Sequence, residues 1–405
     1  MMYSFKLTPL VLESPDWYND HMSEFGETES LKKIYQLKSN LNIVKTKLDD
    51  VYNLQLAGTI MRSFDPFATT KYRIAKKANA MNVTNAWLKG YELFYQHNLI
   101  PRDAKLNSFV YFDNASFPGS FILAANHMVN TISNIKDFKW HASSLLEETK
   151  DNKEPLADSY KLYINYPNNW LMHQGNNGDI AEAKNILDFQ KQFKDTYGDA
   201  HVVDLYSCDL GTDVSSNYNA QEEIHFMLNL CQIACGLSTL KSGRNMVVKH
   251  YTIFEPFTIS YIALLTNLFE SVEICKPLTS KRTNSEIYVV CKNYLYPFKP
   301  KSSQQYVYDV FMDRMSTKNT SHIISSKYIQ QQISDIETAV SHIFKKQMQA
   351  LNFFIFSVRN IKDPATNERC YKELNNINHQ IRKKFEQTTI KQINNKYRLR
   401  MKKKY

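Results

Sequence analysis

Residues Gly243–Asn293, GRNMVVKHYTIFEPFTISYIALLTNLFESVEICKPLTSKRTNSEIYVVCKN, alternate between strand-like and helix-like segments. Asn245–Tyr251 and Val272–Lys276 are short apolar runs rich in β-branched residues, which predicts strands. The apolar stretch Pro256–Phe269 between them is longer and predicts a buried helix. A helix that joins two strands is typical of a parallel βαβ unit.

The end of this stretch predicts a change of strand direction. Glu286–Lys292 (EIYVVCK) is a further predicted strand, separated from the preceding one only by the polar residues Pro277–Ser285. A parallel connection needs a crossover of a dozen or more residues, so the last two strands should pair antiparallel.

Upstream of this stretch the same alternation begins near residue 81. Further strands are predicted at Ser108–Phe112, Lys139–Ser143 and Val202–Cys208, and a helix at Gln221–Leu240. Eight of the ten glycines lie between Gly90 and Gly243, where turns would connect these elements. The pattern predicts an α/β domain over residues 81–297, with a mainly parallel sheet and an antiparallel last strand.

Both flanks of this region are predicted to be helical extensions. In residues 1–80, Thr28–Leu56 has apolar side chains at helical spacing. Residues 298–405 contain no glycine, and Ser325–Arg359 and Asn367–Lys404 predict long helices. The 405 residues, 43% of them hydrophobic, are enough for two or three such modules around a sizeable core.

The net charge of +10 is concentrated at the C-terminal end of the chain. Residues 361–405 hold thirteen basic and four acidic side chains, a net charge of +9, which leaves +1 for residues 1–360. Such a tail is interpreted as a solvated helical face or as an arm that holds RNA without sequence preference. The nearly neutral remainder says nothing about function through its charge alone.

Cysteine and hydropathy patterns favour a reducing, cytoplasmic setting. The six cysteines form no C-x-x-C pair, no Cys/His run has zinc spacing, and no metal site is predicted. The first residues do not resemble a signal peptide, and Phe257–Phe269, the longest apolar stretch, is too short and polar to span a bilayer.

Two glycine-containing turns are candidate ligand loops. Asp113–Phe121 (DNASFPGSF) follows a predicted strand and precedes a helix, where backbone N–H groups could approach a ligand. Asn177–Ile180 (NGDI) could place a carboxylate beside an adenine or ribose. An ordinary turn explains the first equally well, and explains the second better.

Four charged residues are candidates for chemistry. Asp209 ends a predicted central strand, where side chains face the crevice of an open sheet. Lys249 lies inside an apolar strand, and a buried ammonium needs a partner. Glu286 begins the last strand, and Lys89 lies on an amphipathic helix. Taken singly, Asp209 could equally be a helix cap, and solvated surface positions are the better explanation for Glu286 and Lys89.

Together these four residues resemble a known constellation. Lysine, strand-end aspartate, strand lysine and strand-start glutamate occur in the order of the Lys-Asp-Lys-Glu tetrad of the FtsJ-like 2′-O-ribose methyltransferases. NAWLKGYELF around Lys89 and the stretch Gly243–Asn293 carry the resemblance, which covers about residues 81–297. It is nearest to the cap-specific branch, in particular the type found in African swine fever virus and other large cytoplasmic DNA viruses.

The resemblance implies a class I methyltransferase (Rossmann-like) fold and S-adenosyl-L-methionine as cofactor. The implied reaction methylates the ribose 2′-oxygen of the first transcribed nucleotide of capped mRNA, with Lys89, Asp209, Lys249 and Glu286 as catalytic residues. Lys249 would lower the pKa of the 2′-hydroxyl or accept its proton. Its own pKa would be lowered by burial and by Lys89, and balanced by the two carboxylates.

The implied binding residues are candidates by position. For the cofactor they are Asp113, Pro118, Gly119, Ser120, Phe121 and Asp179; for RNA they are Lys276, Lys281 and Arg282. The implied setting is the cytoplasm of an infected host, or the virion, with other capping or transcription proteins as candidate partners. The loop departs from the family pattern, because Phe117 precedes Pro118 and Ser120 replaces a glycine. A serine that needed a positive φ there would be strained, and Phe117 could block the cofactor.

Three functions therefore remain open. The leading hypothesis is an mRNA cap 2′-O-methyltransferase, supported by all four tetrad positions. A ribosomal RNA 2′-O-methyltransferase would use the same chemistry on a different RNA. The altered loop instead favours a non-catalytic RNA-binding or scaffold protein that keeps a relic methyltransferase fold.

Overall fold

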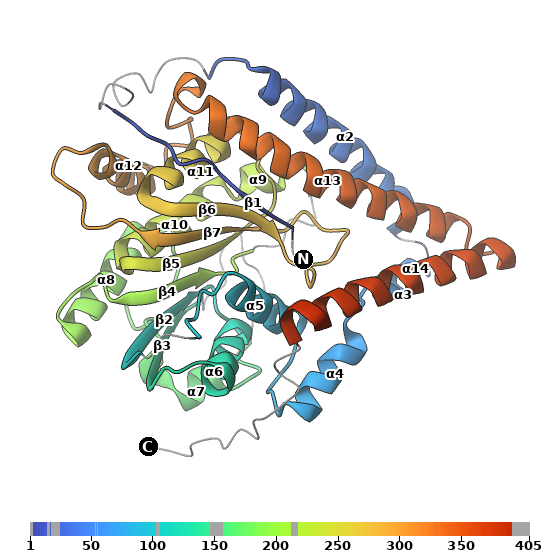
Figure 1. Ribbon diagram of the computed structural model, residues 1–405, viewed down its shortest axis with the longest axis horizontal. Coiled ribbons are helices and arrows are strands. Elements are labelled where there is room, and N and C mark those ends of the chain that lie inside the picture. Colours follow the sequence, from blue (N-terminus) through green and yellow to red (C-terminus); the bar gives the residue numbers. More distant parts are fainter. Residues whose placement is uncertain are drawn as a thin grey trace.

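A seven-stranded sheet forms the centre of the molecule (Figure 1). The computed structural model describes residues 3–13, 17, 25–52, 54, 56–102, 106–145, 157–211 and 218–390. The strands follow the order β1-β6-β7-β5-β4-β2-β3 across the sheet. Their bounds are β1 Tyr3–Lys6, β2 Ser108–Asn114, β3 Asp137–Ser143, β4 Val203–Cys208, β5 Leu240–His250, β6 Phe269–Lys276 and β7 Ile287–Tyr294.

The strand directions confirm the predicted mixed sheet. Strands β2, β3, β4 and β5 pair in parallel, whereas β7 is antiparallel to both β5 and β6. The last strand in sequence therefore runs antiparallel to both of its neighbours, as predicted, but it lies between β5 and β6 and not at the edge. The edge position is taken by β1, a strand that the sequence analysis missed within its helical 1–80 region.

Helices cover both faces of the sheet. Their bounds are α2 Glu29–Tyr52, α3 Ala57–Ser63, α4 Ala68–Lys77, α5 Asn85–Gln96, α6 Ser120–Ile132, α7 Leu162–Asn165, α8 Ala183–Tyr197, α9 Gln221–Ile224, α10 Phe226–Thr239, α11 Pro256–Leu268, α12 Ser303–Thr317, α13 Gln330–Arg359 and α14 Pro364–Phe385. Three 3₁₀ turns, Pro167–Asn169, Tyr218–Ala220 and Ser326–Tyr328, and a π-helical turn, Glu386–Ile390, complete the described elements.

Alternation along the strands divides the apolar side chains between two cores. Met246 and Val248 of β5 pack on one face with α8, α10 and α11, and Val247 packs on the other with α5 and α6. The same alternation in β7 places Val289 on the first face and Tyr288 on the second. A strand covered on both faces is apolar throughout, which explains why the central strands were recognisable in the sequence.

The terminal segments pack onto this α/β unit. Helices α2 and α13 lie side by side outside the first face (Figure 1). On the second face, Phe385 at the end of α14 contacts Phe67 before α4, with ring centroids 5.1 Å apart. The predicted helix Asn367–Lys404 thus begins earlier, at Pro364, and ends at Phe385; residues 391–405 lie outside the described residues.

Within the described part of the chain, no helix combines the length and apolar character needed to cross a membrane. All six cysteines are buried and unpaired, so they act as packing residues, as expected for Cys231 and Cys235 on α10. The described residues contain no cluster of three or more His, Cys, Asp or Glu that could hold a metal ion.

Candidate functional site

Three strands deliver charged side chains to one edge of the sheet. Asp209 directly follows β4, and Lys249 is the penultimate residue of β5. Glu286 directly precedes β7, and because β7 is antiparallel, its start meets the carboxyl ends of its neighbours. Lys249 lies opposite Tyr288 in the β5–β7 register. Strand polarity alone therefore brings Asp209, Lys249 and Glu286 together.

Helix α5 supplies the fourth charge, Lys89. The Thr84 hydroxyl accepts a hydrogen bond from the backbone N–H of Trp87 at 3.1 Å and caps the start of this helix. Gly90 allows a close approach to α6, since a Cβ atom there would lie only 3.0 Å from the Phe121 ring. This approach sets Lys89 against the sheet edge.

The four side chains form one buried ion cluster. Lys89 Nζ lies 2.9 Å from Glu286 Oε2 and 3.4 Å from Asp209 Oδ2. Lys249 Nζ lies 3.1 Å from Asp209 Oδ1 and 2.6 Å from the Asp209 carbonyl oxygen. The cluster sums to zero charge, and every member is hydrogen-bonded, which is the condition under which buried charges are tolerated.

The cluster keeps both lysines charged in the free protein. Burial is the largest single effect and lowers the pKa of Lys249, but Asp209, Tyr251 and Glu286 together outweigh it, so the pKa lies above its ordinary value. The pKa of Lys89 is raised for the same reason, against burial and against Lys249. Burial opposes and Lys89 favours ionisation of Glu286, whose pKa falls to about 2. The expectation of a lowered pKa for Lys249 is therefore wrong for the free protein.

A cavity of about 640 Å³ opens beside the cluster. Asp209 and Lys249 belong to the cluster and also line this cavity. Among the cofactor candidates, Asp113, Pro118, Ser120, Phe121 and Asp179 line this cavity. Gly119 is not a lining residue; it caps the start of α6 with φ of +104°, and its backbone N–H donates to the Ser116 carbonyl oxygen. The volume falls in the range of small-molecule and cofactor sites.

Two carboxyl groups line this cavity, Asp113 from strand β2 and Asp179 from a loop. Asp113 accepts hydrogen bonds from the hydroxyls of Ser116, at 2.6 Å, and Ser207. Burial raises the pKa of Asp113 to about 7, although these hydroxyls oppose the rise. Asp179 is half-buried and accepts from the backbone N–H of Ala181 at 2.9 Å. It follows a turn closed by the isolated bridge between His173 and Asn176.

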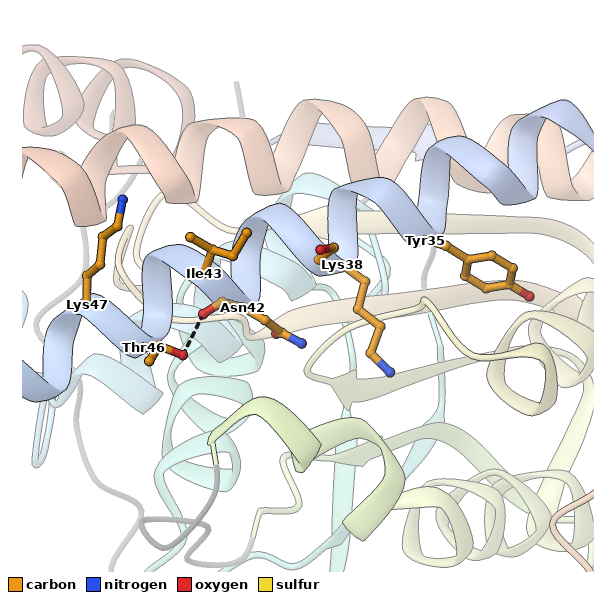
Figure 2. A pocket seen from close by; sticks show the side chains of 7 residues that line it. Tyr35, Lys38, Asn42, Ile43, Thr46 and Lys47 are labelled. Atoms are coloured by element: carbon orange, nitrogen blue, oxygen red, sulfur yellow. Dashed lines mark hydrogen bonds between the residues drawn. The ribbon is translucent and has the colours of Figure 1, made fainter.

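A second hollow lies along α2 and is formed by different residues from the cavity at the cluster. Figure 2 shows Tyr35, Lys38, Asn42 and Thr46 along this groove, which shares no lining residue with the cavity at the cluster. Lys38 is already paired with Glu223 and Glu255. The groove thus gathers no set of converging reactive groups, unlike the cavity beside Lys249.

The sequence of the sheet and its charged edge matches a known family. A family model described as "FtsJ-like methyltransferase" matches residues 82–294, over half of the chain. The chain belongs to the FtsJ-like methyltransferase family. Lys89, Asp209, Lys249 and Glu286 all fall within the matched region.

Several curated relatives agree with this FtsJ-like assignment. A protein of African swine fever virus, named a probable methyltransferase, is 34% identical over 80% of this chain and 76% of its own length. A cap-specific mRNA (nucleoside-2′-O-)-methyltransferase 2 of Drosophila melanogaster is 31% identical over 67% of this chain and 38% of its own. The chain therefore spans little more than a third of that second relative.

A solved structure of a Plasmodium falciparum protein, named as a ribosomal RNA methyltransferase, is 17% identical. It covers 52% of this chain and 98% of its own, with a TM-score of 0.34, too low to support any assignment by itself. The FtsJ-like assignment rests on the family model and on the viral relative.

The altered loop is accommodated without the strain that its sequence suggested. The residues with positive φ in this loop are Ala115 and Gly119, while Ser120 is the first residue of α6 and has an ordinary backbone. Phe117 turns against Trp170, with ring centroids 4.7 Å apart, and against the edge of Tyr163. It lines one wall of the cavity without closing it.

The predicted RNA-binding cations have different surroundings. Lys281 is exposed and Arg282 is half-buried, so both can meet a ligand. Lys276 is buried, and its Nζ donates to the Asn284 side chain at 2.6 Å, the Asn284 carbonyl at 2.9 Å and the Glu286 carbonyl at 2.6 Å. All three N–H bonds of its ammonium are thus used inside the loop, so Lys276 supports this loop, and RNA binding by Lys276 stays a prediction.

Supporting residues around the cluster were missed in the sequence. Ser280 donates to Glu286 Oε1 at 2.8 Å, and Tyr288 donates to Asp209 Oδ1 at 2.7 Å. Alternation in β7 could have indicated Tyr288, which shares a face with Glu286. Glu92 and Glu222 carried no signal, because each is buried by contacts with loops that are distant in sequence.

Proposed function

We propose that this chain is an S-adenosyl-L-methionine-dependent 2′-O-ribose methyltransferase that acts on the first transcribed nucleotide of capped mRNA. The observation that carries the proposal is the buried Lys89–Asp209–Lys249–Glu286 cluster at the mouth of a cofactor-sized cavity. The family assignment and the cap-specific names of relatives support it. We place this reaction in the cytoplasm, with residues 81–297 as the catalytic unit and other capping or transcription proteins as candidate partners.

The cavity suits the proposed cofactor in its chemistry. Asp113 and Asp179 offer carboxyl oxygens to an amino group and to ribose hydroxyls, and Phe117 and Phe121 offer apolar surface. S-adenosyl-L-methionine, when bound, supplies an electrophilic methyl group. The remaining task of the protein is to present a ribose oxygen that can attack it.

Lys249 is the residue placed to activate that oxygen. Its ammonium has three N–H bonds, and among the described residues Asp209 accepts two of them. The third can be donated to the 2′-oxygen, where the positive charge stabilises the oxyanion as the hydroxyl proton leaves to solvent. Because Lys249 is already protonated, it acts first as an electrostatic partner and not as the proton acceptor.

Lys89, Asp209 and Glu286 hold that ammonium in position. Asp209 bridges both lysines, and Glu286 fixes Lys89 at 2.9 Å. A displacement of about 1 Å at such a site can cost about 100-fold in rate, which explains the need for a complete cluster.

Methyl transfer to matched RNA substrates tests the proposal. We expect a transcript with a 5′ cap to be methylated and the same transcript without a cap to react far more slowly. Preferential methylation of an uncapped, structured ribosomal RNA fragment would favour the ribosomal RNA alternative. Methylation at the second nucleotide would correct the proposed position.

Calorimetry with S-adenosyl-L-methionine tests the relic alternative. The open 640 Å³ cavity and the unstrained Ser120 favour binding. No heat of binding at millimolar cofactor would favour the non-catalytic scaffold.

A further inference from the structure

A third, smaller cavity lies on the other side of the loop that carries Ser280 and Glu286. It measures about 300 Å³ and is enclosed by the start of β1, the loop after β6, and helices α13 and α14. Tyr3 and Lys276 pair in the β1–β6 register at its floor. The cavity is therefore built from both terminal extensions together with the catalytic loop.

The lining of this cavity, here called the basic pocket, is strongly cationic. Lys276, Arg282, Lys346 and Lys384 line it, and none of the described residues in its lining is an aspartate or a glutamate. The Nζ atoms of Lys346 on α13 and Lys384 on α14 lie 5.2 and 5.8 Å from the centroid of the Tyr3 ring. Two helices thus bring like charges to one ring, with no acid in the lining to offset them.

The cations of the basic pocket keep donors available. Among the described residues, Arg282 Nη1 is buried and has no hydrogen-bond partner. No described carboxylate pairs with Lys346 or Lys384 either. The Lys276 ammonium, in contrast, donates all of its hydrogen bonds within the loop. A buried guanidinium nitrogen without an acceptor is costly, and an oxyanion is the ligand that would satisfy it.

The loop that carries Ser280 and Glu286 connects the basic pocket to the Lys89–Asp209–Lys249–Glu286 cluster. Ser280 lines the basic pocket and donates to the Glu286 carboxylate, and Lys276 lines it and donates to the Glu286 carbonyl. A ligand in the basic pocket would therefore lie one loop away from Glu286 and Lys89.

We propose that the basic pocket binds phosphate groups of the RNA strand whose ribose is presented to Lys249. This assignment rests on the proposed function for the identity of the ligand, and on the residues above for its chemistry. Three available cations, a buried unpaired guanidinium nitrogen and the absence of lining acids suit a multiply charged phosphate. The helical extensions would then supply a substrate subsite.

Neighbouring lysines provide a matched control. Lys345 and Lys383 are exposed, directly precede Lys346 and Lys384, and do not line the pocket. Calorimetry on the full chain would compare K346A/K384A with K345A/K383A, using inorganic tripolyphosphate as the probe. We expect the first pair to weaken binding at least tenfold and the second less than twofold. An equal effect of both pairs would overturn the proposal.

Methyl-transfer kinetics identify the source of the phosphate. With a capped transcript, K346A/K384A should raise KM at least fivefold and change kcat less than twofold, while K345A/K383A changes neither. An unchanged KM would overturn RNA as the ligand and leave free polyphosphate as the source. If no RNA is methylated but the tripolyphosphate result holds, the proposed function fails and the phosphate site stands.

Discussion

Lys249 shows how far a single residue can be interpreted from its sequence. Its position inside an apolar strand indicated a buried ammonium that needs a partner, and Asp209 is that partner at 3.1 Å. The direction of its pKa shift was not predictable, because it depends on whether burial or the surrounding groups Asp209, Tyr251 and Glu286 together have the larger effect. That balance is set by distances between residues from different strands.

The pH dependence of the reaction follows from these ionisations. The pKa of Glu286 is about 2 and that of Lys249 is raised, so both stay charged across pH 6–9. The 2′-hydroxyl must still lose its proton, and we expect kcat to rise steadily with pH over this range, up to about tenfold per unit. A pH–rate profile measures this. A plateau beginning near pH 7 would show that a neutral lysine is required instead.

Glu286 also links the fold to pH. A carboxyl group with a lowered pKa contributes stability that is present above its unfolded value and lost as pH falls. The contribution of Glu286 should therefore disappear as the pH drops from about 4.5 towards 2.

At the scale of elements, the strands and central helices were the most predictable part. Six strands were recognised in the sequence. The central strands β4 and β7 are buried on both faces over most of their length, which explains their apolar runs, whereas the edge strand β3 is partly exposed. The four-residue strand β1 could not be recognised in the sequence, because it is short and its backbone hydrogen bonds are made with β6, over 260 residues away. The Asp113–Phe121 loop was located in the sequence, but its two residues with positive φ, Ala115 and Gly119, were not.

Gly119, in the turn before α6, can be tested by substitution, with Gly198 as a matched control glycine. Gly119 has φ of +104°, and a Cβ there would lie 2.3 Å from Leu162 Cδ1; Gly198 has φ of +85° with open space around it. Gly119→Ala and Gly198→Ala should each cost about 1–2 kcal/mol of stability. Only Gly119→Ala should weaken cofactor binding, by calorimetry. Equal cofactor affinity in both variants would show that this loop does not form the cofactor site.

Glu92 is expected to position the catalytic loop from α5. Its carboxylate accepts the backbone N–H groups of Leu278 and Thr279, at 2.9 and 3.0 Å, and the Thr279 hydroxyl at 2.7 Å. Glu92→Ala leaves three donors without this acceptor, so stability should fall by about 2–4 kcal/mol and kcat with it. Denaturant unfolding and methyl-transfer rates measure both.

Two further variants make the Glu92 test specific. Glu270→Ala removes an exposed acid from β6 and should leave both quantities unchanged. Burial raises the pKa of Glu92 to about 7, so its stabilising share is present below about pH 4.5 and is lost as pH rises through 7. Glu92→Gln should remove that pH dependence. Wild-type stability and kcat in Glu92→Ala would contradict the positioning role.

At the scale of the whole molecule, the N- and C-terminal extensions pack closely against the α/β unit. Helices α2 and α13 cover one face, β1 closes the sheet edge, and the end of α14 packs on the other face. The sequence predicted the helices of these extensions but not their contacts. Amphipathic spacing shows that one face of a helix is buried, but it does not show which element that face packs against. The tail charge likewise indicated RNA without locating a site.

Truncation of the basic tail separates RNA affinity from catalysis. A cut at residue 380 would remove Phe385 from its contact with Phe67 and disturb the fold, so the cut belongs after Ile390. Residues 391–405 hold seven basic and no acidic residues. Their removal should weaken RNA binding and reduce the salt slope by up to about 5, with kcat at saturating RNA unchanged. An unchanged slope, measured by titration at several salt concentrations, would show that the tail does not contact RNA.

The most direct test of the central claim is nucleoside analysis of a capped transcript after incubation with S-adenosyl-L-methionine. Lys249→Arg keeps the buried charge but changes its geometry, and Lys241→Arg is a matched control at an exposed position of the same strand. We predict a 2′-O-methyl group on the first transcribed nucleotide with the wild type and with Lys241→Arg, and a loss of at least 100-fold in rate with Lys249→Arg. A methylated base, no methylated product, or full activity in Lys249→Arg would contradict the account.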